Sequence, residues 1–319
     1  MTEHAVSPLR ILVIHPIFDF LSITGGWTRP VRCHQVRKRA EAMACLGDTD
    51  VLVTMVWQND FLEKAPDLRL VQSITSGVEQ FDIQALKSRG VPLCNARGAN
   101  AVAVAEHALA LIFSIARFLP EARDDQARKF WRPLTAGRRR RELASSHVVI
   151  VGYGAIGAHL AGLCRALGIR VTVVRRHVPE SHRDGIDFAE VDRFASLAAL
   201  VDYVVLACPL TEQNRGMLNA RVLAGMQPHA AVINVARGGL VVEEDLVSAL
   251  LSGQIAAAGL DTFADEPLPE SSPLWSLPNV VVTPHQAGES ELYEHRVADI
   301  LRENLTRLDE GRDLLNRIV

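Results

Sequence analysis

Three titratable residues in the second half of the chain, Arg237, Glu266 and His285, each follow an apolar segment that predicts a buried strand. An Arg can hold a substrate carboxylate in a bidentate grip and polarise the neighbouring carbonyl group. A His can protonate that carbonyl oxygen while a hydride reaches its carbon. A Glu beside the His favours imidazolium and is expected to raise the His pKa. Beside a nicotinamide site, these residue types would predict hydride transfer to or from a small carbonyl acid.

Each of the three residues also has a separate structural explanation. Arg237 is compatible with a helix-capping charge, Glu266 with a turn before Pro267, and His285 with a polar loop after Pro284. Ligands of open α/β sheets bind at the carboxyl ends of parallel strands, which is where all three residues are expected. A dinucleotide site in the same chain therefore favours the joint interpretation.

A glycine-rich turn supplies such a site. The segment Val148–Gly157 predicts a buried strand, a turn and the start of a helix, with glycines at 152, 154 and 157. This is the G-x-G-x-x-G pattern in the context that dinucleotide binding requires. Gly152 allows the tight turn, Gly154 lets the backbone approach a pyrophosphate, and Gly157 lets the helix pack close to the sheet.

The next strand predicts which dinucleotide is bound. In NAD-binding sites an acidic residue about 20 residues after the glycines bonds the adenine ribose. Here the strand Arg170–Val174 is followed by Arg175 and Arg176, with no Asp or Glu. A guanidinium group binds a 2′-phosphate that a carboxylate would repel, so we expect NADP(H) to be preferred over NAD(H). The alternative is that both arginines are merely exposed charges at a strand end.

Strand-like and helix-like segments alternate along the chain, which predicts βαβ units, an α/β fold and doubly wound parallel sheets. The strands expected first are Arg10–His15, Asp50–Met55, Leu68–Ile74 and Val91–Cys94. The strands expected in the second series are His147–Val151, Arg170–Val174, Tyr203–Ala207, Ala231–Val235, Ala256–Leu260 and Val280–Thr283. The expected helices include Val31–Leu46, Ala103–Arg117, Ala155–Leu167, Glu243–Leu251 and Glu291–Leu308, the last returning to the first domain.

Size and composition narrow the class of protein. The 319 residues are 48% hydrophobic, enough for two domains, and a net charge of −3 gives no reason to expect nucleic acid or a membrane surface as partner. The basic run Arg138–Arg141 is expected to be a solvated loop. Five scattered cysteines without a C-x-x-C pair predict reduced, buried thiols and no metal site. No secretory signal or membrane span is apparent, so we expect a soluble cytosolic protein.

At this point the chain resembles the D-isomer-specific 2-hydroxyacid dehydrogenase family over nearly its whole length. At position 175 many members carry Asp, whereas this chain carries Arg. In this respect the chain resembles the glyoxylate and hydroxypyruvate reductase branch of the family. The motifs that carry the resemblance are Thr75–Asp82, Val104–His107, Gly152–Gly157, Pro209–Thr211, Asn234–Gly239, Asp261–Pro267 and Thr283–Gly288.

The resemblance implies a role for each matching residue. Arg237 corresponds to the substrate-orienting Arg, Glu266 to the Glu that tunes the His, and His285 to the general acid/base. Asp261 resembles the carboxylate that contacts the nicotinamide amide. The Ser76-Gly77 turn resembles the segment whose backbone N–H groups hold the substrate carboxylate. The reaction implied is reduction of a 2-oxo acid to a D-2-hydroxy acid.

The resemblance also implies the cofactor contacts and the domain plan. Residues 1–101 and 288–319 would form a flavodoxin-like substrate-binding domain, and residues 102–287 an inserted Rossmann-type NADP-binding domain. Family members are usually dimers built around the helix at Ala103–Arg117 and its connector, so a homodimer is expected. The expected cofactor contacts are Gly152, Tyr153, Gly154, Ala155, Ile156, Gly157, Arg175, Arg176, Cys208, Pro209, Thr211, Val235, Ala236, Asp261, His285, Ala287 and Gly288.

Related functions remain as alternatives. Formate dehydrogenases share the fold but lack the Glu, so Glu266 argues against that activity, whereas phosphonate-oxidising relatives keep all three residues. Nucleotide-sensing co-repressors also keep them but favour NAD(H), and Arg175 counts against this class. Gln286 stands where a β-branched apolar residue is more usual and has no functional explanation. Substrate size depends on Met55, Val56 and Trp57, which either form an apolar wall for a bulkier 2-oxo acid or simply cover the core.

Overall fold

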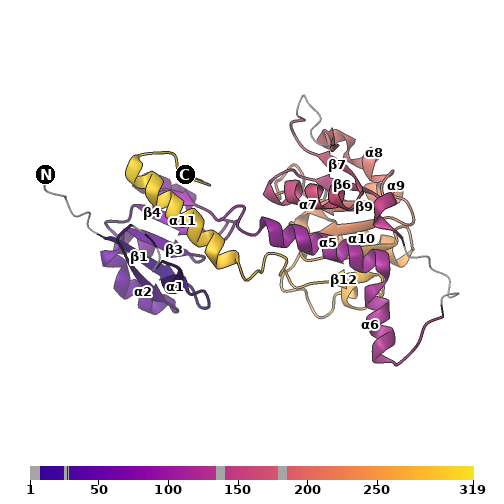
Figure 1. Ribbon diagram of the computed structural model, residues 1–319, viewed down its shortest axis with the longest axis horizontal. Helices are drawn as coiled ribbons and strands as arrows, with labels where there is room; N and C mark the ends of the chain where they lie inside the picture. Colours follow the sequence, from indigo (N-terminus) through magenta and orange to yellow (C-terminus); the bar gives the residue numbers. More distant parts are fainter. Residues whose placement is uncertain (1–7, 25–26, 28, 134–140, 179–184) are drawn as a thin grey trace. The chain divides into compact units, whose positions relative to one another are not determined.

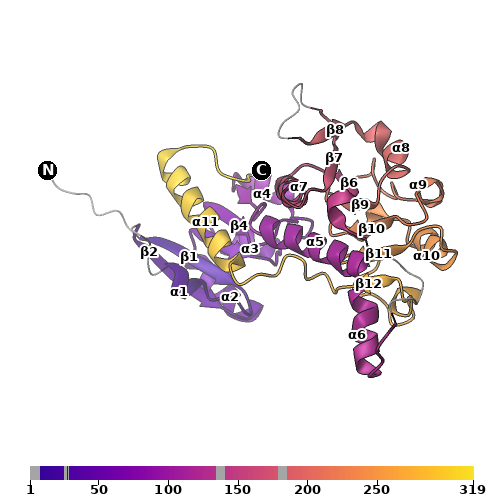
Figure 2. The same ribbon diagram turned by 45° about the vertical axis from the view of Figure 1, so that its right-hand side comes forward.

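The computed structural model describes residues 8–24, 27, 29–133, 141–178 and 185–319, so Arg138, Arg139 and Arg140 of the basic run lie outside the described residues. The chain divides into two compact units, and each has its own parallel sheet (Figures 1 and 2). Unit 1 contains residues 1–99 and 290–319, and unit 2 contains residues 100–289.

Unit 1 is a five-stranded parallel sheet in the order β2-β1-β3-β4-β5, which is the flavodoxin-like order. Its strands are β1 (Leu9–Ile14), β2 (Val31–Val36), β3 (Val51–Thr54), β4 (Leu70–Ser73) and β5 (Leu93–Cys94). Its helices are α1 (Phe20–Thr24), α2 (Arg39–Cys45), α3 (Asp60–Lys64), α4 (Ile83–Arg89) and α11 (Tyr293–Glu310). A 3₁₀ turn, η1, spans Leu46–Asp48.

Side chains alternate between the two faces of this sheet, as the two-residue period of a strand requires. In β1, Ile11 and Val13 pack with α1 and α11, whereas Leu12 and Ile14 pack with α2, α3 and α4. Helix α11, drawn in yellow, runs along the sheet in Figures 1 and 2 and buries Leu301 in its core. The C-terminal segment therefore completes the unit that the N-terminal segment begins.

One expected helix, Val31–Leu46, is wrong in its first half. Residues 31–36 form β2, and only Arg39–Cys45 is helical. In β2 the exposed residues Arg32 and His34 alternate with half-buried neighbours, and the strand lies at the sheet edge. This alternation has the two-residue period of a strand. The polar side chains of Arg32 and His34, however, interrupt the run of apolar residues by which a strand is recognised in the sequence.

Unit 2 is a seven-stranded parallel sheet in the order β12-β11-β10-β9-β6-β7-β8. Counted from β6, this is the Rossmann order 3-2-1-4-5-6 with one further strand, so the expected α/β class is confirmed. Its strands are β6 (His147–Val151), β7 (Arg170–Val174), β8 (Asp187–Ala189), β9 (Tyr203–Leu206), β10 (Ala231–Asn234), β11 (Ala257–Leu260) and β12 (Val280–Val282). The short strand β8 was not expected from the sequence.

Helices cover both faces of this second sheet. Helices α5 and α7 pack on the face that receives Val148 and Ile150, and α8, α9 and α10 pack on the face that receives Val149 and Val151. The helices of unit 2 are α5 (Ala101–Arg117), α6 (Leu119–Ala127), α7 (Ala155–Ala166), α8 (Phe194–Ala198), α9 (Ala220–Gly225) and α10 (Glu243–Leu251). Its 3₁₀ turns are η2 (Leu143–Ser145), η3 (Val191–Arg193), η4 (Gly238–Leu240) and η5 (Pro273–Trp275).

Helix α5 is the most apolar long helix of this unit. It buries residues along its length, including Val104, Ala108 and Ile112, between α7 and the sheet. Within the described ranges no single helix is long and apolar enough to cross a membrane. Only α5 and α6 taken together reach that length and composition, and they are bent by 66°.

Candidate active site

A short hydrogen bond joins His285 to Glu266. The distance from His285 Nδ1 to Glu266 Oε2 is 2.6 Å, and Glu266 Oε1 accepts a hydrogen bond from the Phe263 N–H at 3.0 Å. An ionised carboxylate only accepts, so Nδ1 of His285 carries the proton and Nε2 faces away from the Glu. The imidazole is 49% exposed. This arrangement fixes the ring and leaves one nitrogen free for proton exchange with a ligand.

The backbone of His285 is held in the left-handed region, at φ 51°. This conformation is uncommon for a residue other than glycine and costs on the order of 1–3 kcal/mol. Asp261 provides the compensating contacts. Its carbonyl oxygen accepts from His285 N at 2.9 Å, and its carboxylate accepts from the N–H groups of Gln286 and Ala287 at 3.0 Å each. The loop is therefore anchored to the end of β11.

Arg237 follows β10 in a turn that is fixed by Asn234. The Asn234 side chain accepts from Ala236 N at 3.1 Å and donates to the Arg237 carbonyl oxygen at 3.0 Å. The half-buried guanidinium group donates from Nη1 to the Ala236 carbonyl oxygen at 2.8 Å. The remaining guanidinium donors can bind a carboxylate in the bidentate mode.

Gly238 connects the Arg237 turn to the segment that carries Glu266. A Cβ atom at position 238 would lie 1.9 Å from the carbonyl group of Phe263, so only glycine fits without displacing backbone. Because Phe263 N in turn donates to Glu266, the two loops form one packed unit at the carboxyl edge of the sheet. The structure thus brings Arg237, Glu266 and His285 to neighbouring strand ends, as the sequence predicted.

The glycine loop has the shape that a dinucleotide pyrophosphate requires. Gly152 has φ 107°, and a Cβ there would lie 2.7 Å from the Ala207 carbonyl oxygen; at Gly157 it would lie 2.1 Å from the Gly152 carbonyl oxygen. At Gly154, by contrast, the space around a Cβ is open. Helix α7 begins immediately afterwards, with Ala155 exposed and no acidic residue in its first turn. Its free N–H groups therefore suit a phosphate.

The end of β7 carries a cation beside this loop. The guanidinium carbon of Arg175 lies 5.6 Å from the centre of the Tyr153 ring, a cation–π distance. Tyr153 also meets Phe188 edge-on, with ring centres 5.0 Å apart. Among the described residues no carboxylate forms an ion pair with Arg175 or with the exposed Arg176. The contact with Tyr153 thus positions the planar guanidinium group of Arg175 and leaves its charge unpaired by any described carboxylate.

The loop after β9 is fixed by its own hydrogen bonds. The Asn214 side chain accepts from Thr211 N at 2.7 Å and donates to the Pro209 carbonyl oxygen at 2.8 Å. Burial raises the pKa of the Cys208 thiol above its ordinary value, so the side chain remains a neutral thiol at physiological pH. Cys208 accordingly offers an apolar wall at this strand end, and no thiolate.

The remaining expected cofactor contacts differ in exposure. Val235, Ala236 and Ala287 are buried, at 7%, 8% and 4% exposure, and Ile156 is half-buried. A Cβ at Gly288 would lie 2.9 Å from the Asn100 side chain.

Within the described ranges no three His, Cys, Asp or Glu side chains are grouped to hold a metal ion.

The residues expected to hold substrate from unit 1 lie in a turn after β4. The Asn95 side chain donates to the Ser76 carbonyl oxygen at 2.6 Å, and Thr75 Oγ1 donates to the Gly77 carbonyl oxygen at 2.8 Å. Within the described part of the chain, the N–H groups of Ser76 and Gly77 donate no hydrogen bond. They are therefore available to an anionic ligand.

Trp57 packs against unit 1 itself. Its ring centre lies 5.9 Å from that of Phe61 and 5.7 Å from that of Phe81, and its Nε1 donates to Asn59 at 3.0 Å. These contacts favour the second interpretation of Trp57, in which it covers the core. Met55 remains exposed at 39%.

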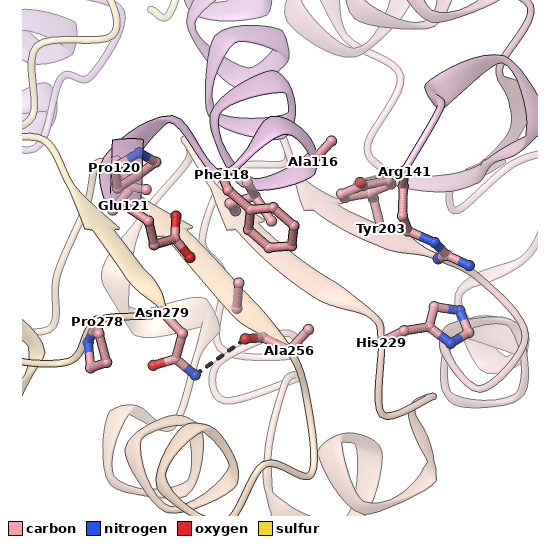
Figure 3. Close-up of a pocket in the computed structure, with 13 residues that line it drawn as sticks. Ala116, Phe118, Pro120, Glu121, Arg141, Tyr203, His229, Ala256, Pro278 and Asn279 are labelled. Atoms are coloured by element: carbon pink, nitrogen blue, oxygen red, sulfur yellow. Dashed lines mark hydrogen bonds between the residues drawn. The ribbon is translucent and has the colours of Figure 1, made fainter. Parts of the chain in front are cut away.

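A separate pocket lies at the opposite edge of the unit 2 sheet (Figure 3). Phe118 and Glu121 of the α5–α6 region line it together with Tyr203, which begins β9, and Asn279, which precedes β12. Asn279 donates to the Ala256 carbonyl oxygen at 3.2 Å. Since the amino ends of parallel strands share one edge, this pocket is distinct from the site that contains His285.

Comparison with known proteins supports a common ancestry for this arrangement. Residues 109–287 match the family model described as "D-isomer specific 2-hydroxyacid dehydrogenase, NAD binding domain". A glyoxylate/hydroxypyruvate reductase B of Citrobacter koseri is 33% identical over 309 residues, which cover 94% of this chain and 92% of the relative. A D-3-phosphoglycerate dehydrogenase of Methanocaldococcus jannaschii is 31% identical over 278 residues and covers 86% of this chain.

This chain spans about half the length of the D-3-phosphoglycerate dehydrogenases it matches, with 52%, 42% and 59% of three of them covered. Solved structures match it over almost its whole length. The NADPH-dependent glyoxylate/hydroxypyruvate reductase of Sinorhizobium meliloti, in complex with citrate, superposes with a TM-score of 0.81 at 26% identity and covers 98% of each chain. A D-isomer specific 2-hydroxyacid dehydrogenase of Xanthobacter autotrophicus, in complex with NADPH and MES, gives 0.78 at 28% identity and covers 97% of this chain and 98% of that one.

Proposed function

Because the chain belongs to the D-isomer specific 2-hydroxyacid dehydrogenase family, we propose that it reduces 2-oxo acids to D-2-hydroxy acids and prefers NADPH. The observation that carries the proposal is the 2.6 Å hydrogen bond between His285 and Glu266 in a loop packed beside Arg237. A nicotinamide dinucleotide, when bound, supplies the hydride. The glycine loop and Arg175 are the residues that would hold it, since the loop leaves room at Gly154 and the cation lies beside Tyr153.

The residues of this chain supply orientation and the proton. Arg237 binds the substrate carboxylate and polarises the adjacent carbonyl group. In unit 1, the N–H groups of Ser76 and Gly77 donate no hydrogen bond to a described residue and can donate to an anionic ligand. As the carbonyl oxygen gains negative charge, His285 donates the proton on Nε2 to it, and Glu266 stabilises the imidazolium from which that proton leaves. In the oxidation direction His285 takes the proton back.

A substrate panel tests this function. Purified protein is assayed with glyoxylate, hydroxypyruvate, phenylpyruvate and, for oxidation, D-3-phosphoglycerate, each with NADPH/NADP⁺ and NADH/NAD⁺ in parallel. We expect turnover of at least one 2-oxo acid, with a higher kcat/KM for NADPH than for NADH. Tight nucleotide binding without turnover on the whole panel would instead favour a nucleotide-sensing protein. Formate and a phosphonate are added to the oxidation assays, and oxidation of either would identify a different dehydrogenase of the same fold.

Arg175 offers a direct test of the cofactor preference. We expect Arg175→Ser to raise KM for NADPH by about 10- to 100-fold, the effect of losing a hydrogen bond between charged groups, and to leave KM for NADH nearly unchanged. Arg170→Ser is the matched control, because Arg170 lies at the amino end of the same strand and forms an ion pair with Asp187 at 3.1 Å. An equal effect of Arg175→Ser on both nucleotides would contradict the preference.

We further propose that the protein is a cytoplasmic homodimer, with α5, α6 and the following segment in the interface. Leu119, Phe130 and Trp131 are exposed at 52%, 51% and 93% in and after α6, and Phe118, Pro120 and Glu121 of the same region line the pocket of Figure 3. Exposed apolar side chains of this size commonly mark a protein interface. Light scattering after size-exclusion chromatography should give twice the chain mass of 34.9 kDa; a mass of one chain would exclude the dimer.

A further inference from the structure

His107 on α5 is a half-buried titratable residue that has no role in the proposed chemistry. Its side chain is 20% exposed, and its Nε2 lies 3.0 Å from Thr283 Oγ1 and 3.7 Å from Asp261 Oδ1. Thr283 stands two residues before His285 in the loop after β12. His107 therefore contacts the loop that carries His285, the proposed acid/base, through Thr283.

The direction of these hydrogen bonds follows from the chemistry of the groups. Thr283 Oγ1 lies 2.6 Å from Asp261 Oδ1 and is its donor, because the carboxylate only accepts. The single hydroxyl proton of Thr283 is then used, so His107 Nε2 must be the donor in its contact with Thr283. The result is one chain of donors, from His107 Nε2–H to the Thr283 hydroxyl and from there to Asp261 Oδ1.

The same carboxylate holds the backbone on the far side of His285. Asp261 is 1% exposed, and besides the Thr283 hydroxyl it accepts from the N–H groups of Gln286 and Ala287. The left-handed conformation of His285, at φ 51°, lies between these anchor points. Rotation of the Asp261 carboxylate would release both N–H groups and with them the strained residue. A donor that polarises Thr283 strengthens the bond that prevents this rotation.

We propose that His107 is a positioning residue for the reaction. It donates to Thr283, keeps the Asp261 carboxylate in its loop-binding orientation and thereby maintains the backbone conformation that presents His285. The kinetic consequence rests on the proposed function, because it requires His285 to be the acid/base. The structural consequence does not, because it concerns the hydrogen bonds of Gln286 and Ala287.

A pair of variants separates hydrogen-bond donation from packing. His107→Met keeps most of the side-chain volume and removes the donor, whereas His107→Gln keeps an N–H donor at a similar distance from the backbone. His159→Met is the matched control, since His159 lies half-buried on α7 and takes no part in this chain of donors. Circular dichroism and hydrogen exchange in β6 report whether each variant is folded.

Hydrogen exchange of the amides of Gln286 and Ala287 is the primary measurement. In His107→Met we expect their exchange to accelerate on the order of tenfold, as loss of a single hydrogen bond implies, with His107→Gln and His159→Met close to wild type. We expect kcat of His107→Met to fall by a similar factor, and His107→Gln to restore kcat.

The alternative outcomes are distinct. If the Met and Gln variants behave alike in exchange, the donor is irrelevant and the proposal is overturned. If exchange changes as expected but kcat of an active enzyme does not, the positioning role is overturned as well. If wild-type protein turns over no 2-oxo acid, the proposed function fails, and the exchange data still decide whether His107 maintains the loop.

Discussion

Replacing His285 by Ala should lower kcat by about 10²- to 10⁴-fold, the range for removal of a general acid/base, while Kd for NADPH remains near the wild-type value. The imidazole is the group whose Nε2 is free after Nδ1 has bonded to Glu266. No other described His is joined to Glu266. Single-turnover kinetics should place the loss in the hydride-transfer step, and fluorescence titration with NADPH should show intact nucleotide binding.

The unusual backbone of His285 calls for a second variant. At φ 51° an Ala residue pays a conformational cost that Asn tolerates better, so a defect in His285→Ala alone has two explanations. His285→Asn keeps the left-handed conformation and a hydrogen-bond donor but transfers no proton near neutral pH. We expect the Asn variant to lose nearly as much kcat as the Ala variant. Near-normal turnover of either variant would show that His285 is not the acid/base.

Replacing Arg237 by Lys should lower kcat/KM for the 2-oxo acid by about 10²- to 10³-fold, although the charge is kept. A Lys ammonium is a point donor and lacks the planar pair of N–H groups that matches a carboxylate. The substitution also removes the hydrogen bond that Arg237 Nη1 donates to the Ala236 carbonyl oxygen. We expect most of the loss in KM for the 2-oxo acid, with a smaller part in kcat, and none in KM for NADPH.

Arg221→Lys on α9 is the matched control for this experiment, because Arg221 is an exposed arginine of the same unit and lies outside the proposed site. Its steady-state constants should equal those of wild type. If Arg237→Lys raises KM for NADPH as much as KM for the 2-oxo acid, then Arg237 acts on the nucleotide and the assignment to the substrate carboxylate is wrong.

The parts of the fold that the sequence predicted correctly are those with a strong local pattern. The strands β6, β7, β9 and β10 are mostly apolar and almost entirely buried in a parallel sheet, and β6 is followed by glycines whose spacing has a steric reason. Strand β2 was missed because it is an edge strand in which the exposed side chains of Arg32 and His34 interrupt the apolar pattern. Strand β8 has only three residues, too few to show a period.

The sequence predicted the candidate site as a set of residue types and not as a geometry. Asp261 illustrates the limit. The family resemblance marked it as functional, but the bonds it makes to the loop of His285 join residues 22 to 26 positions apart. The contact of His107 with Thr283 spans 176 positions. No periodicity in the sequence encodes such pairs, and the left-handed φ of His285 results from them.

The two-segment composition of unit 1 has a consequence for how the protein is made. Four residues of α11 complete the core that packs on β1 and β3, namely Val297, Ala298, Leu301 and Leu305. During translation the ribosome adds residues 100–289 between these two parts, which takes roughly 10–40 s at ordinary elongation rates. For that interval one apolar face of the first sheet has no helix α11 to cover it. We therefore expect nascent unit 1 to expose apolar surface of the kind that chaperones bind, whereas unit 2 is one continuous segment of the chain.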